Sequence, residues 1–102
     1  MLMKNPVHPG QLIAANLEEL GVSVAEAAKG MKITRQQLYN VIRGRSAVSP
    51  DMALRLEQAF GGGAAMWMGM QAAYDLAQAR KGQGKKTIRR LSERKTAVPS
   101  LS

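Results

Sequence analysis

The sequence predicts an all-α fold, with five helices in residues 1–81 and a basic tail, expected to be disordered, in residues 82–102. Strand patterns are scarce, because no stretch alternates apolar and polar residues for long and β-branched residues are thinly spread. Helix-capping residues and glycine boundaries, in contrast, recur along the chain. With 102 residues and 45% hydrophobic content, the chain can hold one small core, and a second independent domain is not expected.

The first helix is expected from Pro9 to Leu20. Proline suits the first turn of a helix, where its missing N–H group is not needed. Ile13, Leu17 and Leu20 fall at helical spacing and form an apolar face. Gly21 can take the left-handed conformation that closes the helix.

The second and third helices are each marked by a cap. Ser23 and Glu26 match the capping box, in which the hydroxyl and the carboxylate each satisfy an unpaired backbone N–H group, and this helix runs to about Met31. Thr34 is the next cap candidate, and Gly44 ends the third helix. The apolar residues of the third helix are Leu38, Val41 and Ile42.

A fourth helix is expected to begin after Ser49, because Pro50 and Asp51 suit a first helical turn. The run Gly61-Gly62-Gly63 ends this helix. No strand precedes the run and no Lys-Ser/Thr pair follows it, so it is not a phosphate-binding loop. The inward residues of the fourth helix are Ala53, Leu56 and Phe60.

The fifth helix, from about Ala64 to Lys81, has a different pattern. Gln71, Asp75 and Gln78 form one narrow polar stripe, and nearly all the other residues are apolar. This is more apolar surface than one small core covers from one side. The helix is either a central core helix or shared between the core and a second copy of the chain, and we favour the second interpretation. The expected homodimer contacts are Met66, Trp67, Met70, Ala73, Tyr74 and Ala77.

The formal net charge of +8 is unevenly distributed. Residues 1–79 carry seven Lys/Arg and six Asp/Glu, whereas residues 80–95 carry eight Lys/Arg and one Glu. Because the excess lies in the tail, a solvated extension explains it as well as nucleic-acid binding does. Any argument for DNA binding therefore depends on the body of the chain.

The second and third helices predict a helix-turn-helix, because only about three residues separate them and both have apolar faces that must meet one core. In that motif the second helix presents its N-terminal residues to the DNA major groove. Arginine can form two hydrogen bonds to guanine, and glutamine or asparagine two to adenine. A solvated helix face is the alternative interpretation, since these residues are common on surfaces. The outward residues are Arg35, Gln36, Gln37, Tyr39, Asn40 and Arg43.

Residues at helix starts and in the loop after the third helix are candidates for phosphate contacts. Hydroxyl, backbone N–H and guanidinium groups can hold phosphates and so set the register of a protein on DNA. The candidates are Ser23, Thr34, Arg45 and Ser46.

Residues 21–61, GVSVAEAAKGMKITRQQLYNVIRGRSAVSPDMALRLEQAFG, resemble the helix-turn-helix core of the XRE class, the phage-repressor and Cro-like regulators. The flanking segments NPVHPGQLI and WMGMQAAYDLAQAR are similar to those of the HigA/VapI antitoxins of type II toxin–antitoxin modules. The resemblance covers about residues 4–81 and implies one DNA-binding and dimerisation domain. It also implies a homodimer that binds its own operator DNA and neutralises a HigB/RelE-like, mRNA-cleaving toxin.

The resemblance also implies roles for single residues. Family members commonly carry glycine where this chain has Lys32, at a turn position for which a left-handed conformation is expected. Lysine adopts that conformation only at a steric cost, so this turn is the main departure from the family pattern. Base reading is implied for Arg35, Gln36 and Asn40, with Gln37 and Tyr39 as neighbours, and phosphate contact for Thr34, Arg43, Arg45 and Ser46.

Catalysis, metal binding and a cofactor are not expected. His8 is the only histidine, it has no acidic neighbour in the sequence, and we expect it to cap or brace the entry to the first helix. Without cysteine the chain has neither disulfides nor thiolate ligands. The lack of cysteine, of an apolar run of about 18 residues and of a signal-peptide pattern favours a cytoplasmic protein without membrane contacts.

Two rival hypotheses remain beside the antitoxin. One is a solitary XRE-class repressor without a toxin, and the other is a nonspecific basic DNA-binding protein. The role of the tail is open among added phosphate contacts, a solvated extension and a segment that orders on a partner.

Overall fold

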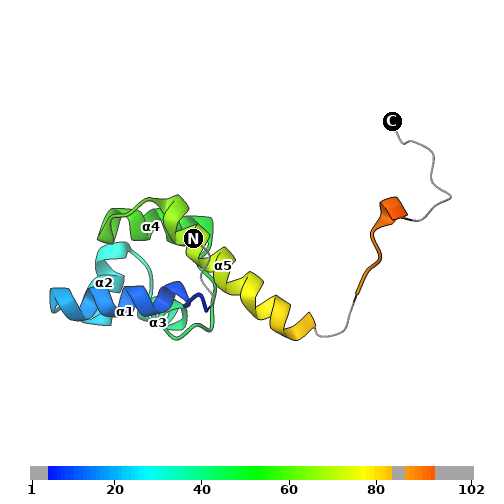
Figure 1. Ribbon diagram of the computed structural model, residues 1–102. Coiled ribbons are helices and arrows are strands. Elements are labelled where there is room, and N and C mark those ends of the chain that lie inside the picture. Colours follow the sequence, from blue (N-terminus) through cyan, green and yellow to red (C-terminus); the bar gives the residue numbers. More distant parts are fainter. Residues whose placement is uncertain (1–4, 84–86, 94–102) are drawn as a thin grey trace.

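The computed structural model describes residues 5–83 and 87–93, and within them it contains helices and no strand. Figure 1 shows the five α-helices and the short 3-10 turn that follows them. The expected all-α class and its five helices are confirmed. The last helix ends at Gln83 rather than at Lys81. The elements are α1 (Pro9–Leu20), α2 (Val24–Met31), α3 (Arg35–Ile42), α4 (Pro50–Phe60), α5 (Ala64–Gln83) and η1 (Leu91–Glu93).

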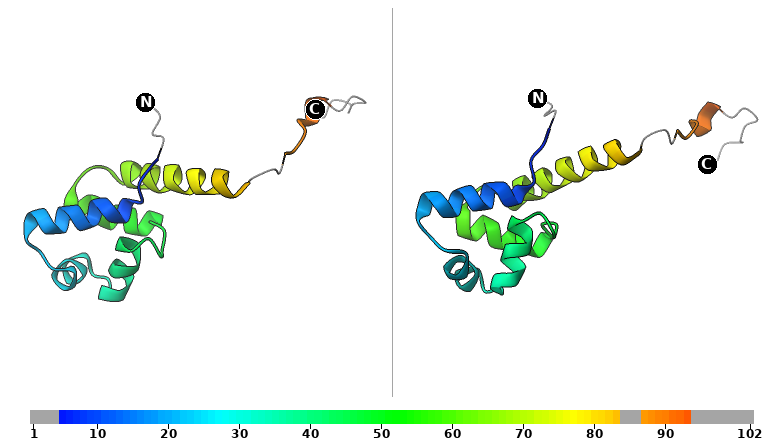
Figure 2. Two further views of the ribbon diagram at one scale, coloured as in Figure 1. Left: turned by 60° about the horizontal axis from the view of Figure 1, so that its bottom comes forward. Right: turned by 90° about the horizontal axis from the view of Figure 1, so that it is seen from below.

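Helices α1 to α4 pack around one core, and α5 extends away from it. In Figures 1 and 2 the first turns of α5 lie against the other helices, whereas its second half projects beyond them. Trp67 is the contribution of α5 to the buried hydrophobic cluster. The cluster consists of Ile13, Leu17, Ala27, Ala28, Met31, Leu38, Val41, Val48, Met52, Ala53, Leu56 and Trp67.

The caps expected at Ser23, Thr34 and Ser49 are all present. Each hydroxyl accepts a hydrogen bond from the backbone N–H three residues further on, at 3.0–3.1 Å. Glu26 completes the predicted capping box by accepting the Ser23 N–H at 3.0 Å. These bonds satisfy N–H groups that a helix start leaves unpaired, so local sequence fixes where α2, α3 and α4 begin.

His8 caps α1, as expected. Its Nδ1 accepts the backbone N–H of Gly10 at 2.9 Å, and the side chain is buried. Burial lowers the pKa of His8 below its usual value, while the nearby Asp75 carboxylate and a hydrogen bond to the backbone of Ser46 oppose that shift. The ring is therefore neutral at pH 7, as its role as an Nδ1 acceptor requires.

Two helices end in a left-handed residue. Gly21 closes α1 at φ 69° and ψ 31°, and Lys32 closes α2 at φ 61° and ψ 43°. Glycine takes this conformation without a Cβ clash, whereas a residue with a side chain takes it at a cost of about 1–2 kcal/mol. The chain nevertheless adopts the expected turn at Lys32.

The polar stripe predicted on α5 is divided in the structure, because Gln71 is buried whereas Asp75 and Gln78 are exposed. Gln71 is only 5% exposed, and its Oε1 accepts the backbone N–H of Val48 at 2.8 Å. The inward side of α5 thus carries a large apolar side chain, Trp67, and one turn later a polar side chain, Gln71. Gln71 can be buried because its amide has hydrogen-bond partners there, which spacing along one helix does not reveal.

The glycine run ends α4 as expected, and Gly61 and Gly62 have positive φ angles. In the described part of the tail, Ile88 and Leu91 are 86% and 69% exposed. The expected disorder of residues 84–86 and 94–102 concerns positions outside the described residues. Within residues 5–83 and 87–93, no helix combines the length and the apolar character needed to cross a membrane.

Candidate nucleic-acid interface

Helices α2 and α3 pack against each other across the turn at residues 32–34 and form the predicted helix-turn-helix. Leu38 and Val41 fix α3 to the core, being almost completely buried. The opposite side of α3 is polar and lies at the surface. It carries the exposed Arg35, Gln36, Gln37 and Tyr39 and the half-buried Asn40.

Gln36 and Asn40 form an amide pair on this surface. The Nε2 of Gln36 donates a hydrogen bond to the Oδ1 of Asn40 at 2.9 Å. This bond leaves the Oε1 of Gln36 as a free acceptor and the Nδ2 of Asn40 as a free donor. Adenine presents the complementary donor and acceptor, N6–H and N7, in the major groove. The pair can therefore meet one adenine with two different side chains.

Tyr39 and Arg43 form a second pair, one turn apart on α3 and its C-terminal cap. The guanidinium carbon of Arg43 lies 5.0 Å from the centre of the Tyr39 ring. A cation in this position is attracted by the ring face, which limits the directions that Arg43 can take. The stacked guanidinium keeps its N–H donors for a phosphate oxygen.

Gln37 has a structural role that the sequence analysis missed. Its Oε1 accepts the backbone N–H of Thr34 at 2.8 Å, while its own N–H donates to the Thr34 hydroxyl at 3.0 Å. Together these bonds make a second capping box, with glutamine in the position that Glu26 has in α2. The side chain thus points back to the start of α3 and leaves only its NH₂ group for DNA.

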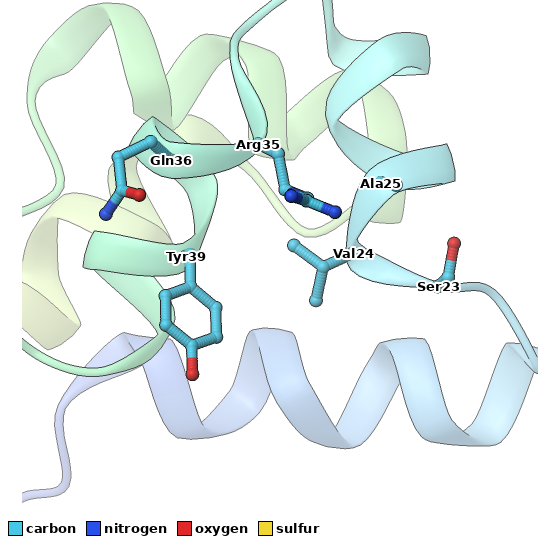
Figure 3. A pocket seen from close by; sticks show the side chains of 6 residues that line it. All are labelled: Ser23, Val24, Ala25, Arg35, Gln36 and Tyr39. Atoms are coloured by element: carbon cyan, nitrogen blue, oxygen red, sulfur yellow. The ribbon is translucent and has the colours of Figure 1, made fainter.

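A hollow of about 440 Å³ lies between the start of α2 and the outward side of α3. Figure 3 shows Arg35 between the two helices, with Gln36 and Tyr39 on one side and Ser23 on the other. The predicted phosphate contact Ser23 thus shares one concave surface with three predicted base-reading residues. The lining residues are Ser23, Val24, Ala25, Arg35, Gln36 and Tyr39.

The loop after α3, residues 43–48, carries the remaining phosphate candidates. Arg43 and Arg45 are exposed, and Ser46 is half-buried. The backbone N–H groups of Arg45 and Ser46 both donate to the Asn40 carbonyl, at 2.8 and 3.2 Å. These two N–H groups are occupied, so Arg45 and Ser46 can contact a phosphate only through their side chains.

Arg55 on α4 holds the turn before α3, and the sequence analysis did not single it out. Its Nη1 donates to the Met31 carbonyl at 2.6 Å, and its Nε donates to Asp51 at 2.8 Å. The Met31 carbonyl belongs to the last turn of α2, where helical partners are missing. The i,i+4 spacing of Asp51 and Arg55 was visible in the sequence, but the carbonyl partner was not.

The predicted dimer residues divide into two groups. Trp67 is 1% exposed, and its Nε1 donates to the Gly61 carbonyl at 3.2 Å. It belongs to the core of its own chain and has no surface to offer a second copy, so we remove it from the set. Met66 and Ala73 are exposed, and Met70, Tyr74 and Ala77 are half-buried.

The described residues contain no group of three or more His, Cys, Asp or Glu side chains placed to hold a metal ion. The outward side of α3 and the 43–48 loop carry amide, hydroxyl, guanidinium and phenol groups. These groups recognise bases and phosphates by hydrogen bonds and charge.

The helix-turn-helix family model matches residues 13–65. Virulence-associated protein A′ of Dichelobacter nodosus is 44% identical over 77 residues, which are 74% of this chain and 67% of that protein. Two solved structures are also similar. The Pseudomonas aeruginosa antitoxin HigA with the higBA promoter has a TM-score of 0.75 and 34% identity, covering 79% of this chain and 89% of that one. A HigA-family addiction module antidote protein from Coxiella burnetii has a TM-score of 0.76 and 31% identity, covering 83% and 99%.

Proposed function

We propose that this chain, which belongs to the helix-turn-helix family that includes the HigA antitoxins, binds the operator of its own operon as a homodimer. We also propose that it neutralises a HigB/RelE-like, mRNA-cleaving toxin and has no catalytic step of its own. The observation that carries the proposal is the outward surface of α3, where base-reading side chains lie beside two arginines of the following loop.

Base reading is assigned to Arg35 and to the Gln36–Asn40 pair. Arg35 is exposed in the first turn of α3, the part of a recognition helix that meets base edges. The amide pair is already joined at 2.9 Å, so little side-chain freedom is lost when it meets an adenine. Tyr39 is an exposed neighbour on the same surface, and its ring stacks with the guanidinium of Arg43. We assign it a contact to a base edge or to the sugar-phosphate backbone.

Phosphate contacts are assigned to five residues around this surface. Arg43 and Arg45 supply charge from the loop, and Ser23, Thr34 and Ser46 supply hydroxyl groups near helix ends. The hydroxyls of Ser23 and Thr34 already accept cap hydrogen bonds, so each can still donate its own hydrogen to a phosphate oxygen.

The dimer is assigned to one side of α5. Met66, Met70, Ala73 and Ala77 follow one another at i, i+4, i+7 and i+11, which places them along one face of a helix. Met66 is 41% exposed in the single chain. A second copy that packs its own α5 against this face would bury a continuous apolar stripe and would space the two α3 helices symmetrically.

The DNA-binding part is tested by selecting duplexes from a random library with the full chain. We expect a two-fold symmetric site whose half-sites are about 34 Å apart, or a multiple of one helical turn. On the selected duplex, Arg35→Ala or Asn40→Ala should cost about 1–3 kcal/mol while bulk-DNA affinity stays nearly unchanged. Equal losses on both DNAs, or protection without sequence preference, would show a nonspecific basic DNA-binding protein instead.

The dimer is tested by sedimentation of Ala73→Glu and of its control Ala72→Glu. Both alanines are exposed on α5, and Ala72 lies outside the stripe of Met66, Met70, Ala73 and Ala77. A glutamate inside the stripe places a charge in the proposed interface, so we expect Ala73→Glu to be monomeric and Ala72→Glu to remain dimeric. A wild-type monomer at micromolar concentration would refute the dimer.

The toxin-neutralising part is tested by expressing the reading frame adjacent to that of this chain. We expect that frame to encode a small basic protein that stops growth unless this chain is co-expressed. Growth that is unaffected by the neighbour would leave the solitary repressor as the function, with the DNA-binding results unchanged.

A further inference from the structure

The 43–48 loop is fastened to parts of the chain outside the helix-turn-helix. Its contacts come from the first residues of α1 and from one side of α5. We propose that His8 and Gln71 are positioning residues for DNA binding, because they fix the loop in the place where its arginines meet phosphates while α3 reads bases. This inference rests on the proposed DNA-binding function.

Gln71 fastens the end of the loop. Its Oε1 accepts the Val48 N–H at 2.8 Å across a separation of 23 residues, and its Nε2 donates to Asp75 at 2.9 Å. Both Gln71 and Val48 are nearly completely buried. A shift of the loop would therefore leave the buried Val48 N–H and the buried Gln71 Oε1 without partners, which costs more than the net contribution of a typical hydrogen bond.

His8 fastens the middle of the loop. Its ring lies edge-on to the Tyr74 ring, with centroids 5.0 Å apart, and next to the backbone of the loop at residues 44–46. Gly44 lies next to the same imidazole, because a Cβ atom placed on this glycine would be 3.8 Å from the ring carbon Cγ of His8. The histidine thus joins the start of α1, the loop and α5 in one buried contact.

The last turn of α3 is held by the same region of α1. A Cβ atom at Gly10 would lie 2.6 Å from the Ile42 carbonyl oxygen and closer still to that of Val41. The backbone of α1 therefore lies directly on the carbonyl end of α3. The loop begins at this point and returns to Asn40 through its Arg45 and Ser46 N–H groups.

These contacts connect two surfaces with different proposed partners. Gln71 contacts the loop at Val48 and Tyr74 contacts His8, while Met70 and Ala73 in the same turns of α5 lie on the proposed dimer face. The position of Arg45 is thereby set relative to α5 and so relative to the second copy of the chain. Neither His8 nor Gln71 needs to touch DNA to act in this way.

The experiment compares Gln71→Met with its control Gln78→Met in the full chain. Methionine keeps the length of the side chain but cannot accept the Val48 N–H or donate to Asp75, whereas Gln78 is exposed on the same helix. At a temperature where circular dichroism shows all variants folded, we expect Gln71→Met to lose about tenfold in affinity for the selected duplex. Gln78→Met should bind like the wild type.

The salt dependence separates positioning from general destabilisation. Each lost phosphate contact reduces the slope of log affinity against log salt by about 0.9, so Arg45→Ala should flatten the slope. Gln71→Met should flatten it as well, and should have little further effect once Arg45 is alanine. Additive effects, or an unchanged slope with a lower melting temperature only, would overturn the proposal.

Two further outcomes are informative. If Arg45→Ala changes neither affinity nor slope while Arg35→Ala still weakens binding to the selected duplex, the loop does not contact phosphates and only the positioning proposal falls. If Gln71→Met does not fold, Asp75→Ala replaces it, because Asp75 is exposed and its loss frees only one side of the Gln71 amide. We expect Asp75→Ala to flatten the slope less than Gln71→Met in folded protein, and no change in slope would overturn the proposal.

Discussion

At its N-terminal end α3 is fixed mainly by residues close in sequence, whereas at its C-terminal end it is fixed by α1 and α5. Thr34 and Gln37 form the cap at the first end, and Arg55 adds one tertiary contact to the preceding turn. At the second end His8, Gly10 and Gln71 hold the helix and its loop.

The difference indicates how α3 is aimed. A local cap decides where a helix starts but not how it is oriented relative to other helices. The contacts at the C-terminal end join α3 to two other elements and therefore determine its direction and the place of the loop. We expect substitutions at the two ends to affect stability and DNA binding in different proportions.

The largest effect is expected for Gly10→Ala, which breaks the C-terminal end. The new Cβ would meet backbone carbonyl oxygens of Val41 and Ile42, which cannot move without displacing α3. We expect a loss of about 3 kcal/mol in the free energy of unfolding, measured by urea denaturation. Gly30→Ala is the control: its Cβ meets open space inside α2, so it should stabilise the chain by about 0.5–1 kcal/mol. Similar losses of stability for Gly10→Ala and Gly30→Ala would contradict the close contact between Gly10 and the end of α3.

The next effect is expected for Arg55→Ala, which breaks the N-terminal end. The Met31 carbonyl loses its 2.6 Å hydrogen bond at the end of α2. We expect a loss of about 1–3 kcal/mol in the free energy of unfolding. Because the Thr34–Gln37 capping box stays intact, the folded variant should keep the salt slope of the wild type on the selected duplex. A flattened slope would show that the turn also places the loop.

A smaller effect of opposite sign is expected for Lys32→Gly, which tests the turn itself. Lys32 has a positive φ of 61°, so glycine removes a steric cost there but adds freedom to the unfolded chain. We expect a net gain of about 0.5–1 kcal/mol in thermal or urea denaturation. The gain in stability should be larger in the Arg55→Ala background, where the turn has lost the hydrogen bond from Arg55 to the Met31 carbonyl. A loss of stability in both backgrounds would show that the lysine side chain itself is needed.

The smallest effect is expected from the titration of His8. Burial lowers its pKa in the folded chain, so the unfolded chain binds the proton more readily. The contribution of His8 to the free energy of unfolding is therefore fully present above pH 6.5. It decreases as the pH drops from 6.5 through the lowered pKa. The effect is small because Asp75 and the Ser46 backbone oppose the shift.

Urea midpoints at pH 7.5 and 5.5 would measure this fall, and His8→Asn, which keeps a capping acceptor, should abolish it. Glu26 acts elsewhere, because hydrogen bonds from Ser23 lower its pKa and its contribution is lost only in more acidic solution. A fall that persists unchanged in His8→Asn would contradict the assignment.

Much of the fold followed from short-range patterns. Ser23, Thr34 and Ser49 marked three helix starts, and Gly21 marked the end of α1. Lys32 was expected in a left-handed conformation from the family resemblance, and the structure has it there. The outward placement of Arg35 and Gln36 also agreed, because Leu38 and Val41 could only face the core.

The sequence was less informative where polar residues had more than one possible partner. Gln37 was counted with the base-reading surface, but it completes a capping box. Gln71 was placed on a polar stripe, but it is buried against the Val48 backbone. Trp67 was counted with the dimer contacts, but it fills the core. In each case the type of residue was noticed and its partner was not.

The sequence by itself determined where the helices begin and end, because caps, left-handed closures and apolar periodicity depend on residues within about one turn of each other. It also determined which types of side chain α3 presents. The tertiary structure alone decided which side of α5 faces inward and that α1 and α5 hold the 43–48 loop. Those outcomes depend on residues such as Val48 and Gln71, 23 positions apart, whose proximity exists only once the helices have packed around one core.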